Sequence, residues 1–107
     1  MPLNQAMVGH RYPDTAPYEV GREKIREFAE AIGDPSPIYR DVEVARAAGH
    51  RDIPAPPTFA VVVAQPATKQ ASFDPSVGLD YSRVVHGEQH FEHHEPIWAG
   101  DVLTARV

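Results

Sequence analysis

The chain has 107 residues, of which 42% are hydrophobic and 23% charged, a composition typical of one small globular domain and not of a disordered segment. The net charge is −5 and the basic residues do not cluster, so neither nucleic acid nor an anionic membrane surface is expected as a partner. The absence of cysteine excludes a disulfide framework. Residues 1–10 lack the features of a signal peptide and no apolar run is long enough to span a membrane, so we expect a cytoplasmic protein.

The N-terminal third predicts two short extended pieces followed by a helix. The extended pieces are Val8–Tyr12 and Tyr18–Val20. After Gly21, apolar residues recur at the helical spacing i, i+3, i+4 and i+7, and charged residues occupy the other face. Gly33 is a typical residue just beyond the end of such a helix. The apolar stripe consists of Ile25, Phe28, Ala29 and Ile32.

Proline-containing turns dominate the middle of the chain. The sequence Asp-Pro-Ser-Pro at residues 34–37 cannot lie inside a helix, because its two prolines lack N–H donors and restrict the residues before them. Asp41 is a suitable N-cap for a short helix over residues 42–48, which Gly49 would end. Residues 50–57 are then expected to form a second loop.

The longest apolar run, residues 59–64, is compatible with two structures. Its three consecutive valines favour a strand. However, Thr58 follows a pair of prolines and can act as an N-cap, and a helix that is apolar on all sides is typical of a buried central helix. The local sequence favours neither structure over the other. Pro66 would end or kink the helix if one formed.

The C-terminal part of the chain predicts more strands. Residues 73–78 are expected to form a loop, residues 82–94 a long strand with poor alternation, and residues 96–101 a turn. Residues 102–107 alternate well, and this alternation runs to the last residue. We therefore expect an antiparallel sheet truncated after its third or fourth strand, with its C-terminal strands missing.

Three histidines of the predicted strand over residues 82–94 raise the possibility of a metal site. In a strand, His86, His90 and His94 would share one face, with about 13 Å between the outer two. A single ion cannot join ligands so far apart. We therefore expect an exposed or dimer-edge polar strand and no metal.

Two stretches of the chain resemble the MaoC-like dehydratases and (R)-specific enoyl hydratases. Gly33–Tyr39 is similar to the family's Gly-Asp-x-Asn-Pro-Ile-His motif, and Glu95–Leu103 is similar to its Pro-Val/Ile-x-x-Gly-Asp-x-Leu turn. Val8–Pro13 and Pro56–Phe59 resemble the N-terminal-type subunits that pair with a catalytic subunit in type II fatty acid synthesis. The resemblance implies a single α+β hot-dog domain over residues 1–107, in which an antiparallel sheet wraps around a central helix.

The resemblance also implies three catalytic parts, of which this sequence keeps one. Active members use an Asp and the His five residues later to activate water, and a Gly N–H at the central helix to polarise the thioester carbonyl. Asp34 matches the acid, but Tyr39 replaces the His, and a phenol with a pKa of about 10 is a poor base at neutral pH. Pro57 replaces the Gly and has no N–H to donate. His50 is the alternative base.

We therefore expect a non-catalytic, acyl-chain-binding subunit of a (3R)-hydroxyacyl-thioester dehydratase, acting in fatty acid synthesis without a cofactor. Its expected partners are a homologous catalytic subunit or a second copy, and an acyl thioester of acyl carrier protein or coenzyme A. One alternative is an active hydratase in which Asp34 works with His50 or Tyr39, and another is an acyl-thioester binding module without a catalytic partner. The residues expected to bind substrate are Ser36, Pro57, Thr58, Phe59 and Phe73.

Overall fold

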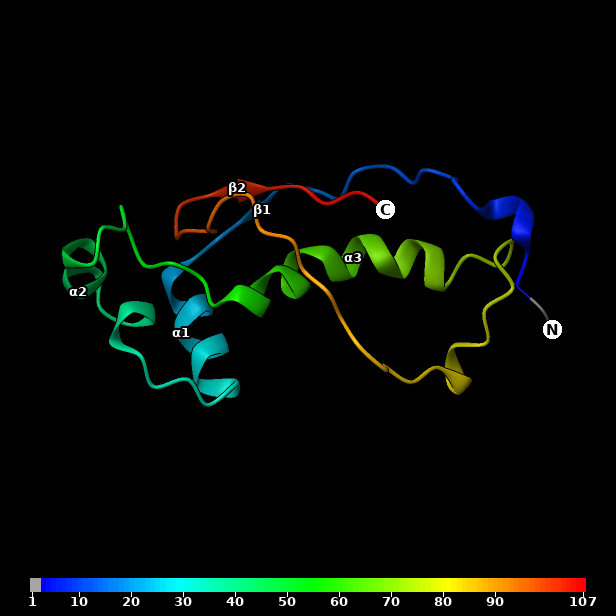
Figure 1. Ribbon diagram of the computed structural model, residues 1–107. Helices are drawn as coiled ribbons and strands as arrows, with labels where there is room; N and C mark the ends of the chain where they lie inside the picture. The colour runs from blue at the N-terminus through cyan, green and yellow to red at the C-terminus, as the bar shows by residue number, and fades with distance from the viewer. Residues whose placement is uncertain (1–2) are drawn as a thin grey trace.

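The computed structural model describes residues 3–107, which form an elongated molecule with extents of 52 × 26 × 21 Å (Figure 1). Its radius of gyration is 16.6 Å, whereas a compact domain of this length would have one of about 13 Å. The elements in chain order are η1 (Gln5–Met7), β1 (Tyr18–Glu19), α1 (Arg22–Ala31), η2 (Pro37–Tyr39), α2 (Val42–Ala47), η3 (Pro57–Phe59), α3 (Ala60–Ser72), η4 (Tyr81–Arg83) and β2 (Val102–Leu103).

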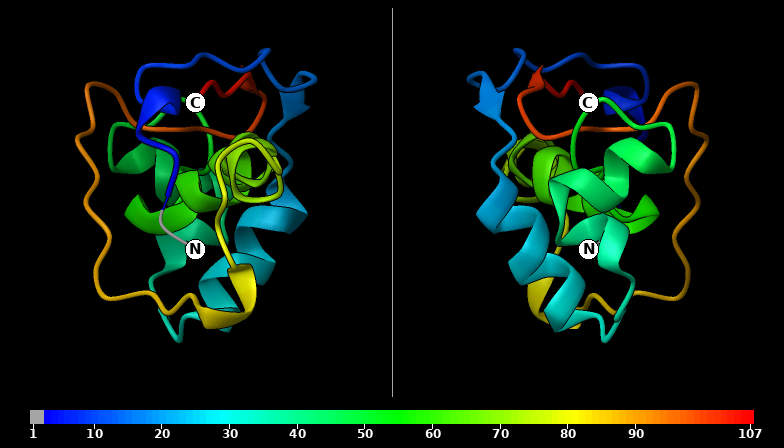
Figure 2. Two further views of the ribbon diagram at one scale, coloured as in Figure 1. Left: turned by 90° about the vertical axis from the view of Figure 1, so that its right-hand side faces the viewer. Right: turned by 90° about the vertical axis from the view of Figure 1, so that its left-hand side faces the viewer.

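The hydrophobic core lies at the end of the molecule that carries α1, the two strands and the start of α3. The C-terminal end of α3 and residues 73–83 lie at the opposite end of the molecule, and residues 84–96 run back toward the core (Figure 1). Viewed along the long axis, α3 occupies the middle, with α1 on one side and residues 84–96 on the other (Figure 2). The core cluster consists of Val20, Ile25, Ile53, Phe59, Val63 and Ala99.

The sheet of the described residues has two antiparallel strands, in which Tyr18 lies opposite Leu103. Backbone hydrogen bonds extend the pairing beyond these strands, because the N–H of Thr15 donates to the carbonyl of Ala105 at 2.9 Å and that of Tyr12 to Val107 at 3.0 Å. The extended structure predicted for residues 18–20 and 102–107 is therefore confirmed. The prediction of an extended piece from Val8 is wrong at its start, since Val8 and the next residue form a turn.

Helix α1 forms as its apolar spacing predicts, with Ile25 and Ala29 fully buried. It ends in a Schellman motif, in which the N–H of Gly33 donates to Glu30 and the N–H of Asp34 donates to Ala29, at 3.1 and 2.9 Å. Gly33 adopts φ +73°, a conformation that costs glycine little. This motif fixes the point at which the chain leaves the helix and enters the Asp-Pro-Ser-Pro turn.

Helix α2 confirms the predicted N-cap. The carboxylate of Asp41 accepts hydrogen bonds from the N–H groups of Glu43 and Val44, at 2.8 and 3.2 Å. Gly49 follows the helix with φ +97°, as expected for the residue that ends it. The end of α2 therefore sets the start of the proline-rich loop that leads to α3.

The apolar run after residue 58 is helical, because one face of it packs into the core and no strand of the described residues pairs with it. Phe59 is fully buried, with its ring edge-to-face against Phe28 at 5.4 Å, and Val63 is buried one turn further on. The predicted N-cap role of Thr58 is wrong, since no side-chain cap bond forms at the start of η3 or α3. Of the two effects predicted for Pro66, an end to the helix or a kink, the first is wrong, because α3 continues to Ser72 with the proline on its exposed side.

The long strand predicted for residues 82–94 is absent. Residues 81–83 form η4, and within residues 3–107 no backbone N–H between positions 85 and 96 donates to another backbone carbonyl. The segment runs along the outside of the molecule (Figures 1 and 2). A strand requires a neighbour to satisfy its backbone groups, and the described residues supply none here. The expectation of three or four strands is therefore wrong for residues 3–107, whose sheet has two strands.

Candidate functional site: a groove along the central helix

A groove of about 440 Å³ runs between α3 and the segment of residues 79–89. Its volume falls within the range of small-molecule sites, roughly 300–1,000 Å³. The helix contributes residues that recur every three to four positions from Val61 to Ser72, and these share one face. At about 1.5 Å per residue, this face is roughly 16 Å long. The groove therefore has the shape to hold an extended chain.

The groove has a mixed chemical character. Val61 and Ala64 supply apolar surface from the helix, while Leu79 and Val84 supply it from the opposite wall. Polar side chains complete the lining, so the groove offers hydrogen-bond partners beside an apolar surface. This combination suits an amphipathic ligand with an apolar chain and a polar end. The polar residues are Gln65, Thr68, Lys69, Ser72, Tyr81, His86 and Gln89.

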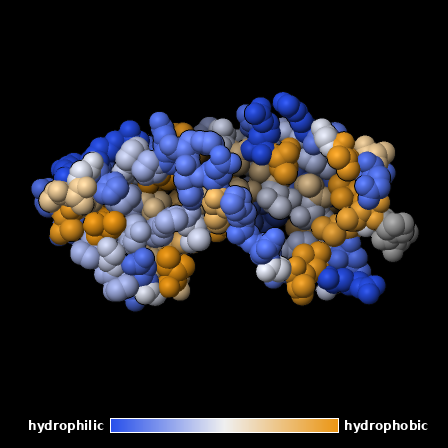
Figure 3. Space-filling model, in the orientation of Figure 1, coloured by the Kyte–Doolittle hydropathy of each residue, from blue (hydrophilic) through white to orange (hydrophobic). Residues whose placement is uncertain are grey.

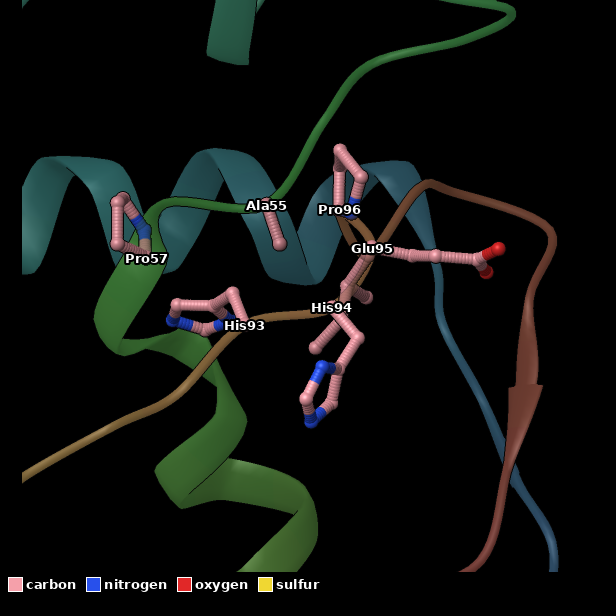
Figure 4. Close-up of a pocket in the computed structure, with 7 residues that line it drawn as sticks. Ala55, Pro57, His93, His94, Glu95 and Pro96 are labelled. Carbon is pink, nitrogen blue, oxygen red and sulfur yellow. The ribbon is translucent and has the colours of Figure 1, made fainter.

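A second pocket, of about 360 Å³, lies at the start of the central helix. Pro57 forms one side, and the imidazole of His93 lies beside it, whereas the carboxylate of Glu95 points away (Figure 4). Sequence reasoning placed His93 and His94 on a polar strand and did not associate them with Pro57. Their positions depend on how the segment folds back toward the helix, and no local pattern signals this.

The turn of residues 33–39, which carries the first family motif and is called the motif turn below, brings Asp34, Ser36 and Tyr39 together. The carboxylate of Asp34 accepts a hydrogen bond from the N–H of Ser36 at 2.9 Å, and the backbone carbonyl of Asp34 accepts one from the Arg40 guanidinium at 2.6 Å. Burial raises the pKa of the Tyr39 phenol above its ordinary value, and the nearby Asp34 carboxylate raises it further. Tyr39 is therefore protonated at neutral pH and cannot act as a base in that state.

His50 lies apart from this turn, at the junction between the proline-rich loop and the turn of residues 96–101. Its Nδ1 accepts a hydrogen bond from the Trp98 indole at 3.1 Å, and the guanidinium of Arg51 stacks on the same indole at 4.3 Å. The backbone N–H of Trp98 donates to the carboxylate of Asp101 at 2.9 Å. The structure therefore joins His50 to Trp98 and does not bring it together with Asp34.

The residues expected to bind substrate occupy different environments. Pro57 lines the pocket at the start of the helix, and Phe73, which is 59% exposed, lines a hollow at the far end of α3. Thr58 is exposed and lies outside the three pockets named here, and Phe59 is enclosed in the core. Val61 and Ala64 lie in the apolar run of residues 59–64, which was expected to form a tunnel wall, whereas the groove residues of α3 beyond position 64 were missed. Their helical spacing would have identified them if the run had been predicted as a helix.

Residues 3–107 contain neither a cluster of metal-binding side chains nor a helix that could span a membrane. No group of three or more histidine, aspartate or glutamate side chains in this range is arranged to hold a metal ion. None of the helices described is both long enough and apolar enough to cross a membrane.

The chain belongs to the FAS1-like dehydratase domain region family, whose model matches residues 6–107. More particularly, it belongs with the UPF0336 proteins. It is 62% identical, over all 107 residues, to a UPF0336 protein of Saccharopolyspora erythraea, 69% of which it covers. It is 60% identical to a UPF0336 protein of Streptomyces coelicolor, with 97% of this chain and 69% of that protein aligned.

Solved structures support the fold. A chain of the C-terminally truncated HadBC complex, a 3R-hydroxyacyl-ACP dehydratase from Mycobacterium tuberculosis, superposes with a TM-score of 0.73 and 34% identity. The match covers 90% of this chain and 65% of that one. A monoamine oxidase regulatory protein from Archaeoglobus fulgius matches with a TM-score of 0.68 and 24% identity, and shows the fold alone. The chain is therefore an α+β domain similar to a subunit of a hot-dog dehydratase complex.

Proposed function

We propose that the chain is a non-catalytic, acyl-chain-binding subunit of a (3R)-hydroxyacyl-thioester dehydratase that acts in fatty acid synthesis. The observation that carries the proposal is the groove of about 440 Å³ along α3. An acyl chain would lie along the helix, with its methylene groups on Val61, Ala64 and Leu79. The thioester would be presented by acyl carrier protein or by coenzyme A, which share the pantetheine arm.

The residues at the family's catalytic positions support a non-catalytic role. Dehydration of a 3-hydroxyacyl thioester needs a base for the C2 proton, an acid for the departing hydroxyl and a donor for the enolate oxygen. Tyr39 is a protonated phenol, and Pro57 has no N–H. The loss of one oxyanion donor alone typically slows catalysis by roughly 100- to 1,000-fold. His50, the remaining candidate base, is hydrogen-bonded to Trp98.

A homologous subunit is the natural source of the missing groups. The HadBC structure is a complex, and one of its chains is 34% identical to this one. In the pair that we propose, this chain holds the acyl chain while the partner contributes an intact acid–base pair. The dehydratase reaction of the pair would convert a 3-hydroxyacyl thioester into a trans-2-enoyl thioester and water.

Binding of dodecanoyl-pantetheine to the purified protein tests the proposal. We expect Val61→Glu to weaken binding by at least tenfold, because it places a charge on the apolar wall of the groove. The matched control is Val102→Glu, at a strand position that is 64% exposed and outside the groove. Equal binding by the two variants would contradict a role for the groove. No binding by the wild-type protein would contradict the proposed function itself.

A further inference from the structure

The far end of the groove along α3 adjoins a separate hollow of about 570 Å³. Ser72, Leu79 and Tyr81 line both spaces, so these three residues form the boundary between them. Ser72 is small and belongs to the helix, whereas Tyr81 is the largest of the three. Removal of the Tyr81 ring would join the two spaces and more than double the volume open to a ligand in the groove.

The ring of Tyr81 contacts a second aromatic ring, and hydrogen bonds stabilise the turn that carries it. It packs against Phe73, the residue that follows α3, with 4.9 Å between ring centroids and a tilt of 42°. The turn that carries Tyr81 is fixed by Asp80, whose carboxylate accepts hydrogen bonds from the N–H and the hydroxyl of Ser82 at 3.2 and 2.6 Å. The surface around this end of the molecule is rich in hydrophobic residues (Figure 3). Tyr81 therefore stands between the groove and the hollow, whose lining combines apolar surface from Phe73, Pro75 and Leu79 with the polar residues Asp74, Asp80 and Ser82.

We propose that Tyr81 sets the maximum length of the acyl chain that the groove accepts. The inference rests on the proposed acyl-binding function and adds a specificity-determining residue to it. An alkyl chain that enters beside Val61 runs along α3 and meets the Tyr81 ring at the Ser72 end. Chains up to this length gain affinity with each methylene, whereas the Tyr81 ring separates further methylenes from the hollow beyond it.

The experiment measures dissociation constants for a series of saturated acyl-pantetheines of increasing even chain length. We expect the wild-type affinity to rise by about threefold to fourfold for each buried methylene and then to level off at a limiting length. Tyr81→Ala should extend the rise by at least two methylenes, so that the longest chains bind about tenfold more tightly than to the wild type. Tyr81→Phe, the matched control that keeps the ring, should retain the wild-type limit.

A second variant tests the same boundary in the opposite direction. Tyr81→Trp enlarges the wall and should move the limit to shorter chains, whether or not the alanine variant is stable. Identical length profiles for the wild type and these variants would overturn the role of Tyr81 while leaving the acyl-binding function intact. No chain-length-dependent binding by the wild type would overturn the proposed function, and the inference with it.

Discussion

The fully buried Phe59 is the position at which a single substitution should most clearly separate a core role from a substrate-binding role. Its side chain is 0% exposed and meets Phe28 edge-to-face at 5.4 Å. Phe→Ala changes in cores cost about 3–5 kcal/mol, and small domains have a free energy of unfolding of roughly 5–15 kcal/mol. We therefore expect Phe59→Ala to remove about a fifth or more of the free energy of unfolding, as measured by urea denaturation followed by circular dichroism.

The same substitution at Phe73 is the matched control. That ring is 59% exposed, so Phe73→Ala should lower the free energy of unfolding by about 1 kcal/mol or less. Phe59→Leu, which fills most of the cavity, should leave acyl-pantetheine binding within about threefold of the wild type. A loss of less than about 1 kcal/mol in Phe59→Ala would refute the core assignment. A large loss of binding in a stable Phe59→Leu protein would restore Phe59 as a substrate-binding residue.

Two further predictions concern polar groups that hold the same end of the molecule together. Hydrogen bonds from Arg22 lower the pKa of Asp52, so this ion pair stabilises the folded state above the ordinary carboxyl pKa and loses its effect as the pH falls through the lowered value. Asp52→Asn should therefore reduce the urea midpoint at pH 7, with a difference from the wild type that shrinks below about pH 4, and a constant difference down to pH 2 would contradict this. Asp41→Ala removes the N-cap of α2 and should cost about 1 kcal/mol in urea denaturation, whereas Asp14→Ala in an exposed loop should cost little.

Local interactions explain which elements could be predicted from sequence. The spacing of Ile25, Phe28 and Ala29 defines a helix because the side chains of one helical face must meet the core together. Asp41 and Gly33 were identified as caps because each acts on backbone groups within a few residues of itself. The motif turn at Asp34 follows from the end of α1 and its prolines in the same way.

The features that were left open or missed depend on contacts between distant parts of the chain. The valines of residues 61–63 have strand propensity, but α3 forms because the core encloses Phe59 and Val63 at helical spacing. Residues 82–94 alternate weakly and have no pairing partner among the described residues. The groove requires α3 and residues 79–89 to lie side by side, and this arrangement leaves no periodic signal in either segment.

The rate of hydration of a trans-2-enoyl thioester by the purified protein alone tests the central claim most directly. Tyr39 and Pro57 supply neither the base nor the oxyanion donor that the reaction needs, so we predict no turnover above the buffer control at neutral pH. Clear turnover by the protein alone, abolished in Asp34→Ala, would contradict the account and identify the chain as an active hydratase.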